Sequence, residues 1–295
     1  MIRIVRLFIP LAAAFVSACS GSGQAEVAKP ALWRVSDPDT TIYLFGTIHM
    51  LPDRYDWRTP RFNAALARAG TLVLEIADVG DANAQASAYK AVATAPGLPP
   101  ILDRAPADKR AALAAAIDKA GLKPAQLDGL KTWAAALTIG TMTGKGSGAS
   151  PLNGVDSQLG ALFRDAGKPV DGLETTRQQL GYFDSLPESA QRKLLLGMAD
   201  DATGDGGKQI TDMIAAWSKG DVRRIAVTFD EELKLSPELA DRLVRQRNAA
   251  WAGWIEQRMA KPGTVMVAVG AGHFAGSDSV IAKLKADGYR VERLQ

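Results

Sequence analysis

Short apolar runs bounded by turn residues cluster toward the two ends of the chain and predict buried strands. β-branched and aromatic residues on both sides of the Pro-containing turn 37–40 predict a hairpin near the N-terminus. Six runs have the composition of strands: 31–36, 41–46, 71–78, 168–175, 263–272 and 289–294. The sheet is therefore expected to be built mainly from the two ends of the chain.

Helical patterns fill the space between the strands. Residues 61–69 and 277–288 each lie between two predicted strands, which favours parallel pairing through crossover helices. The stretches 82–166 and 175–260 are mostly helical, and 143–151 is expected to be a mobile loop. We predict an α/β fold: a central mixed, largely parallel sheet formed by N- and C-terminal segments, with a large helical insertion acting as a layer or lid.

The first residues resemble a bacterial targeting segment. Residues 1–18 combine two arginines, an apolar run and a small-residue end, which predicts a signal peptide. "Val-Ser-Ala-Cys" resembles a lipobox, so Cys19 is the expected site of acylation and 19–30 the lipid-anchored tether. Ser20 after the cysteine implies the outer membrane, facing the periplasm. The domain proper is expected at 31–295, and plain secretion is the alternative.

Composition restricts the classes of function. Cys19 is the only cysteine, so neither a disulfide framework nor a thiol nucleophile is expected. Removing residues 1–18 takes away two arginines and no acids, which lowers the net charge from +3 to +1. A nearly neutral chain gives no reason to propose nucleic acid as a partner.

The two histidines of the chain, His49 and His273, each follow a glycine by three positions at the end of a predicted strand. Glu75 and Glu174 also lie at strand ends. Because open parallel sheets place their ligands at the carboxyl ends of the strands, we expect these four side chains to meet. Each glycine is expected to allow a sharp turn, through positive φ and close approach.

This set of residue types suits metal-assisted hydrolysis. His49, His273 and Glu75 are the expected ligands of a divalent ion, either Mn, Co or Zn, with water completing the shell. Such an ion acidifies bound water and polarises a carbonyl, and Glu75 or Glu174 would act as general base. The sequence does not decide which glutamate is ligand and which is base.

Arginines near these motifs could bind the substrate. Arg177 follows Glu174 by one helical turn. On the helix at 236–260, Arg245 or Arg247 together with Asn248 could hold a carboxylate or phosphate, because a guanidinium binds such groups bidentately.

These motifs resemble those of the TraB/GumN (TraB/PrgY) family, which is related to the Tiki metalloproteases. The resemblance rests on "LWRVSDPDTTIYLFGTIHMLP", "LVLEIAD", "GVDSQLGALFRDAGKPVDGLET" and "VMVAVGAGHFAGSDSVIAKLKADGYRVERL". It implies His49, His273 and Glu75 as family site residues, with Glu174 in "GLET". It also implies a fold similar to the erythromycin esterase and ChaN-like group, and divalent-metal-dependent hydrolysis of peptides.

Two other interpretations remain open. Residues 270–275 fit G-x-G-x-x-A after a strand, with Glu292 about 20 residues further on, which is a weak dinucleotide fingerprint. The two histidines could instead ligate haem or a metal in an envelope lipoprotein without catalytic activity.

Overall fold

The computed structural model describes residues 26–77, 82–146, 150–204, 206–234 and 237–295. The predicted signal peptide, Cys19 and the first part of the predicted tether lie outside these residues. The last part of the tether belongs to the fold, because β1 (Glu26–Val27) pairs in parallel with β4 (Tyr55–Asp56) and Ala28 is fully buried. The folded structure therefore starts before the predicted boundary at residue 31.

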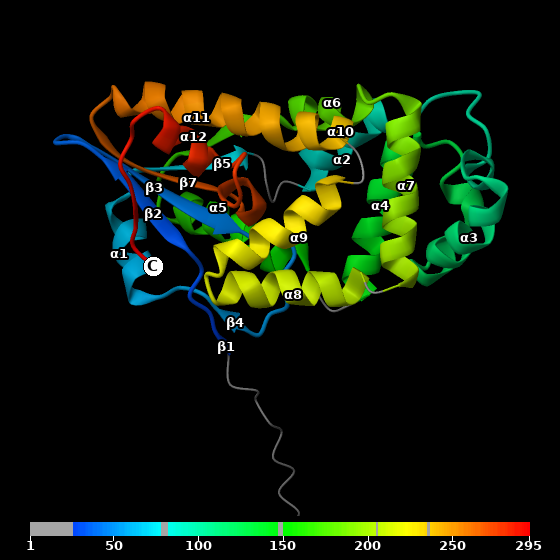
Figure 1. Cartoon of the computed structure of the whole chain (residues 1–295), viewed down its shortest axis with the longest axis horizontal. Helices are drawn as coiled ribbons and strands as arrows, with labels where there is room; N and C mark the ends of the chain where they lie inside the picture. Colours follow the sequence, from blue (N-terminus) through cyan, green and yellow to red (C-terminus); the bar gives the residue numbers. More distant parts are fainter. Residues whose placement is uncertain (1–25, 78–81, 147–149, 205, 235–236) are drawn as a thin grey trace, which may run out of the picture.

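A six-stranded sheet in the order β6-β5-β7-β3-β2-β8 lies in one half of the molecule, at the left of Figure 1. Its strands are β2 (Leu32–Ser36), β3 (Thr40–Thr47), β5 (Thr71–Ile76), β6 (Val170–Glu174), β7 (Gly263–Gly270) and β8 (Val291–Arg293). β6, β5, β7 and β3 are parallel neighbours, whereas β2 is antiparallel to both β3 and β8. The expected mixed, largely parallel sheet and the β2–β3 hairpin are confirmed.

Two strand predictions differ in detail from the structure. The run 263–272 ends as a strand at Gly270, and Ala271–Phe274 forms a short 3-10 turn. The last strand, β8, does not pair beside β7. The connection after β7 passes β3 and β2, and β8 pairs with β2 at the outer edge of the sheet. A local apolar pattern marks a strand, but its partner depends on long-range packing that the pattern does not contain.

Helices pack on both faces of the sheet and beside it. Their bounds are α1 (Pro60–Arg68), α2 (Ala82–Ala93), α3 (Arg110–Lys119), α4 (Thr132–Gly146), α5 (Val155–Asp165), α6 (Thr176–Asp184), α7 (Glu188–Thr203), α8 (Gly206–Ser218), α9 (Val222–Lys234), α10 (Pro237–Ala240), α11 (Gln246–Met259) and α12 (Val280–Ala286). None of the helices in the described ranges is long and apolar enough to cross a bilayer.

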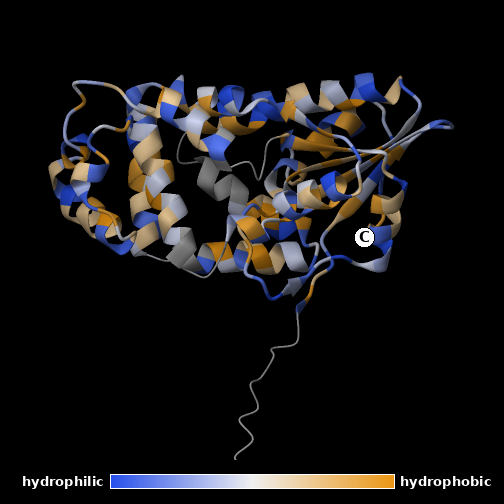
Figure 2. Cartoon of the chain, turned by 180° about the vertical axis from the view of Figure 1, so that it is seen from behind, coloured by the Kyte–Doolittle hydropathy of each residue, from blue (hydrophilic) through white to orange (hydrophobic). Residues whose placement is uncertain are grey.

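Alternate residues of the strands supply two cores, one on each face of the sheet. Phe45 and Leu74 pack with residues of α1, α5 and α8, whereas Leu44, Val73 and Val267 pack with α11 and α12. The period of two in a strand sends neighbouring side chains to opposite faces, and burial of both faces explains the nearly continuous apolar runs. Figure 2 shows the strands of this sheet mostly in the hydrophobic colour.

The helical insertion has its own core beside the sheet. α3, α4 and α7 pack together around Leu113, Ile139 and Leu195, and Figure 1 shows them beyond the ends of the strands. The part of the insertion formed by α3, α4 and α7 therefore lies beyond the strand ends, whereas α5, α8 and α11 cover the faces of the sheet. The loop expected at 143–151 is shorter than predicted: α4 continues to Gly146, 147–149 lie outside the described residues, and Ser150 forms a β-bridge with Leu51.

The helix expected at 236–260 has one irregular turn. α10 leads into a π-helical turn at Asp241–Arg245, and α11 starts at Gln246. A π turn inserts one extra residue into an α-helix and is frequent at functional sites. Here it comes immediately before Arg247 and Asn248.

Candidate functional site

The ends of β3, β5 and β7 bring the predicted residues together. The main-chain N–H of Gly270 donates to Glu75 Oε1 at 2.8 Å. A side chain at Gly270 would place its Cβ 3.2 Å from Glu75 Oε1 and 3.3 Å from His49 Nε2. Gly270 has φ −47°, so close approach and not positive φ requires glycine here. Gly46 is also needed for close approach, because a Cβ there would lie 3.0 Å from Ala271.

Glu75 is a buried carboxylate with partners on both oxygens. Its Oε2 accepts from Arg247 Nη2 at 2.6 Å and from Gln179 Nε2 at 3.0 Å. Its Oε1 lies 3.7 Å from His49 Nε2. Burial opposes ionisation, but the charges of His49 and Arg247 outweigh it and lower the pKa of Glu75 to about 2. Glu75 is therefore an anion at neutral pH.

His49 is paired on its other side with Asp156. The His49 Nδ1 atom lies 3.2 Å from Asp156 Oδ1 in the first turn of α5. Gly154 allows this approach, because a Cβ there would lie 2.2 Å from the His49 carbonyl oxygen. No role was predicted for Asp156, although it lies in the family-like stretch "GVDSQLGALFRDAGKPVDGLET" and follows a glycine by two positions at a helix start.

Two carboxylates favour a protonated His49. Removing water from the ring lowers its pKa, but the charges of Asp156 and Glu75 outweigh that loss and raise the pKa of His49 to about 9. The side chain is 57% exposed, so solvent screens part of this attraction. The direction of the shift still makes His49 mainly an imidazolium at neutral pH.

His273 lies behind Arg247 and is almost fully buried. Its Nδ1 is 2.6 Å from Asn248 Oδ1, while Asn248 Nδ2 donates to the carbonyl oxygen of Asp278. Asn248 Oδ1 can only accept, so Nδ1 of His273 carries the proton and Nε2 faces Arg247 Nη1 at 3.3 Å. Burial, helped by the charges of Arg247 and His49, lowers the pKa of His273 to about 3.

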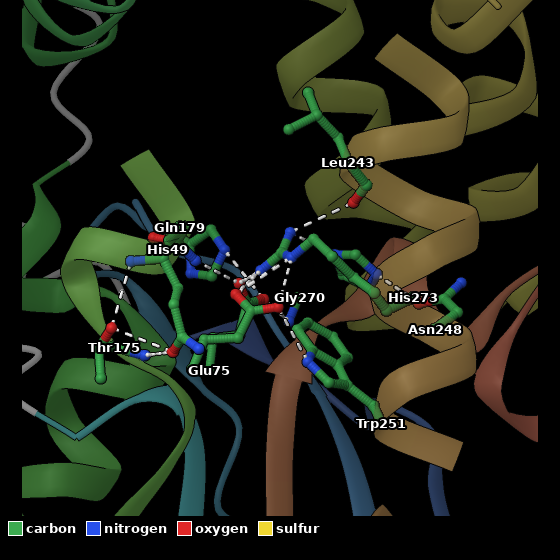
Figure 3. Close-up of polar contacts among 12 residues, drawn as sticks. His49, Glu75, Thr175, Gln179, Leu243, Asn248, Trp251, Gly270 and His273 are labelled. Atoms are coloured by element: carbon green, nitrogen blue, oxygen red, sulfur yellow. Dashed lines mark hydrogen bonds and ion pairs between the residues drawn. The ribbon is translucent and has the colours of Figure 1, made fainter. Parts of the chain in front are cut away.

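Arg247 occupies the centre of the cluster, because its guanidinium contacts Glu75, Glu174 and His273. Figure 3 shows the hydrogen bonds and ion pairs that join the residues of this cluster. The Nη2 atom of Arg247 donates to Glu75 and Glu174, its Nε to Glu174 at 2.9 Å, and its Nη1 to the Leu243 carbonyl and toward His273. Glu174 also accepts from Trp251 Nε1 at 3.0 Å. A guanidinium has five N–H donors, and each has an acceptor here. Glu174 therefore fixes the position of Arg247 and is not exposed to the cavity described below.

The three expected metal ligands do meet, but Arg247 lies between them. His49 Nε2 and Glu75 Oε1 face each other, whereas Nε2 of His273 and Oε2 of Glu75 face the guanidinium. A positive guanidinium at these donors disfavours a second cation there. Among the described residues, no group of three or more His, Cys, Asp or Glu side chains could hold a metal ion. As arranged, the residues do not fit a three-ligand site.

The low pKa of His273 predicts a pH-dependent stability. The folded state keeps this ring neutral until about pH 3, whereas the unfolded chain takes up a proton near pH 6.5. Its contribution is present above pH 6.5 and is lost as the pH falls, by about 1–2 kcal/mol between pH 6.5 and 5. The pKa of His49 shifts in the opposite direction, so its contribution to stability is largest at low pH and most of it is already present at pH 6.5.

Urea unfolding at pH 5 to 7 checks this prediction. The His273→Gln variant is expected to be less stable at pH 7 and to lose less stability than the wild type on acidification. If the free energy of unfolding changed equally with pH in the two proteins between pH 5 and 7, a buried neutral imidazole at His273 would be contradicted.

A cavity of about 730 Å³ lies between the sheet edge and the helical insertion. Thr47, Glu75 and Ala268 line it from the strands, while residues of α2, α4 and α6 line it from the insertion. His49, Asp156, Gln179 and Arg247 also reach it. Glu75 and His49 are thus accessible to a ligand, whereas His273 and Glu174 stand behind them.

Comparison with known protein families and sequences identifies the family of the chain. The sequence model of the TraB/PrgY/gumN family matches residues 31–293. The chain belongs to this family. Two proteins, both called uncharacterized protein YbaP, from Escherichia coli K12 and Shigella flexneri, are each 24% identical to it over 246 residues. The matched region covers 82% of this chain and 87% of each relative. No solved structure matches the chain.

Within this TraB/PrgY/gumN chain, the residues expected to bind substrate are dispersed. Arg177 is exposed on α6. Arg245 pairs with Asp241 at 3.3 Å and lies 3.9 Å from Asp278. Asn248 is fully buried and contacts His273. Only Arg247, which the sequence offered as an alternative to Arg245, lies in the cluster and lines the cavity.

The dinucleotide interpretation has little structural support. The 3-10 turn Ala271–Phe274, rather than a helix start, follows β7. Glu292, the residue expected to hold a ribose, pairs with Arg34 at 2.6 Å. The expected similarity to the erythromycin esterase and ChaN-like group stays a prediction.

Proposed function

We propose that the protein is a hydrolase of the bacterial cell envelope that acts on peptides, with His49 and Glu75 as its catalytic pair. The observation that carries the proposal is the 3.7 Å separation of His49 Nε2 and Glu75 Oε1 at the cavity, with Asp156 behind His49. This separation is too long for a direct hydrogen bond, and it allows one water to contact both groups.

The charges of the pair assign the two roles. Glu75, the anion, accepts a proton from the attacking water as its oxygen bonds to the carbonyl carbon, and the imidazolium of His49 protonates the leaving nitrogen as the C–N bond breaks. The His49 charge is one cause of the low pKa of Glu75, so proton donation by His49 makes Glu75 more basic during the reaction. Return of the proton from Glu75 to His49 completes the cycle.

Thr47 lies in the cavity wall at the end of β3. Its hydroxyl has no hydrogen-bond partner among the described residues and almost no surface open to the cavity, so it does not contact a substrate in this conformation. Arg247 acts as a positioning residue, because its donors already hold Glu75 and Glu174.

The divalent ion that the family resemblance implies is not part of these steps. Since Arg247 occupies the donors of His273 and one oxygen of Glu75, the steps use only the side chains of this chain. Both ring nitrogens of His273 are also engaged, which weakens the alternative of haem ligation.

The cell-envelope location rests on the N-terminal sequence. The basic start, the apolar run and the lipobox-like "Val-Ser-Ala-Cys" support anchoring in the bilayer through acylated Cys19, at the outer membrane facing the periplasm. The short tether before β1 would hold the cavity near that surface.

A peptide library incubated with the purified protein tests the proposal. We expect cleavage that persists in a chelator and is at least a hundredfold slower in Glu75→Gln, because a neutral amide cannot accept the water proton. Glu292→Gln, which alters an exposed ion pair, is the matched control. Absence of cleavage under all conditions contradicts the hydrolase, and cleavage only with added Mn²⁺, Co²⁺ or Zn²⁺ contradicts the metal-free steps.

A further inference from the structure

The charged and apolar residues of the cavity are separated in space. All four charged residues that line it, His49, Glu75, Asp156 and Arg247, belong to the catalytic cluster at the sheet edge. The walls formed by the helical insertion carry apolar side chains and neutral polar groups. A ligand that enters the cavity therefore meets charge at one end only.

The apolar wall comes from three helices of the insertion and one short turn. Leu137 and Met142 of α4, Leu180 and Phe183 of α6, and Tyr89 of α2 line it, all of them half-buried. Leu152 also lines the cavity and is 79% exposed. Exposed apolar surface continuous with a polar site is characteristic of ligand-binding sites.

The core of the insertion holds this wall in place. Trp133 is fully buried, and Tyr89, Leu137, Leu180 and Phe183 pack around it. Tyr89 is also fixed by hydrogen bonds to the Ala134 carbonyl and Thr138. The apolar surface is therefore a preformed part of the fold, and binding an apolar group there requires little ordering of side chains.

We infer that the substrate carries an apolar group next to the scissile bond, and that this group binds between α2, α4 and α6. The inference rests on the proposed function for the position of the scissile bond at His49 and Glu75. A charged group at that position would lose its hydration without a charged partner, whereas an apolar group gains by burial. Two sources share this chemistry: an acyl chain and a hydrophobic side chain of a peptide.

The first experiment measures binding without turnover. The neutral apolar fluorophore N-phenyl-1-naphthylamine is expected to bind saturably to the wild type and equally to His49→Ala. Leu180→Asp should weaken binding at least tenfold, and Leu152→Asp, at an exposed position, should weaken it without affecting folding. Val227→Asp on α9, at a position that is 54% exposed and outside the cavity, is the control. No binding, or equal binding by Leu180→Asp and Val227→Asp, overturns the inference.

The second experiment identifies the source of the apolar group. In a series of p-nitrophenyl esters, we expect kcat/KM to rise about three- to fourfold per methylene if the group is an acyl chain. In peptides, replacing Ala by Leu or Phe beside the cleaved bond should raise it if the group is a side chain. Hydrolysis with no preference in either series overturns the inference but leaves the hydrolase intact. Fluorophore binding without any hydrolysis would contradict the hydrolase and leave the apolar binding site intact.

Discussion

Arg247→Ala is expected to destabilise the protein by about 3–5 kcal/mol, because it leaves two buried carboxylates without their cation. Glu75 and Glu174 are only 7% and 8% exposed, and the guanidinium donates to both. Urea unfolding at pH 7 measures the effect. The reaction rate should also fall, since Glu75 loses the contact that orients it.

The matched control is Arg245→Ala, two residues earlier, at the end of the π-helical turn that precedes α11. Arg245 pairs with Asp241, and its side chain is 42% exposed, so its loss should cost less than about 1 kcal/mol. Arg247→Lys keeps the charge but has fewer donors, and an intermediate stability is expected. Equal stability of Arg247→Ala and Arg245→Ala would show that the buried network does not contribute as described.

His49→Ala is expected to lower kcat by roughly 10²- to 10⁴-fold, the usual contribution of a positioned acid or base. The ring is 57% exposed, so the same change should cost less than about 1 kcal/mol of stability. Kinetics on a peptide or ester that the wild type cleaves, together with urea unfolding, separate the two effects.

Two further variants define the role of the pair. Asp156→Asn removes one of the charges that raise the pKa of His49, so the pH at which His49 loses its proton should fall. His273→Gln should affect stability more than His49→Ala does, because His273 is 6% exposed. If the rate in His49→Ala were unchanged, His49 would have no role in the reaction.

The sequence alone predicted the sheet and four members of the cluster, His49, His273, Glu75 and Glu174. Continuous apolar runs marked β5 and β7 because both of their faces are buried, and the Gly-x-x-His frames placed His49 and His273 at strand ends. Glu75 was found because an acid inside an apolar strand requires a partner. Each of these signals is contained in a short stretch of sequence, so it can be recognised without knowing the fold.

The contacts of the other residues could not be predicted in this way. Arg245 and Arg247 have the same chemistry and lie two residues apart, and only the packing of α11 on the sheet brings Arg247 to Glu174 while Arg245 pairs with Asp241. Asp156 becomes part of the site because the start of α5 packs on the main chain of His49. Glu174 was one of the two glutamates considered as general base, but it is bound by Arg247 and Trp251 of α11 and does not line the cavity.

The wide turn at Asp241–Arg245 sets the direction in which every later side chain of α11 points. Successive residues of a helix are about 100° apart around its axis. One residue more or fewer in that turn would therefore swing Arg247, Asn248 and Trp251 away from Glu174 and His273 while leaving the length of the helix almost unchanged. In this segment, chain length is as much a determinant of the site as the identity of its side chains.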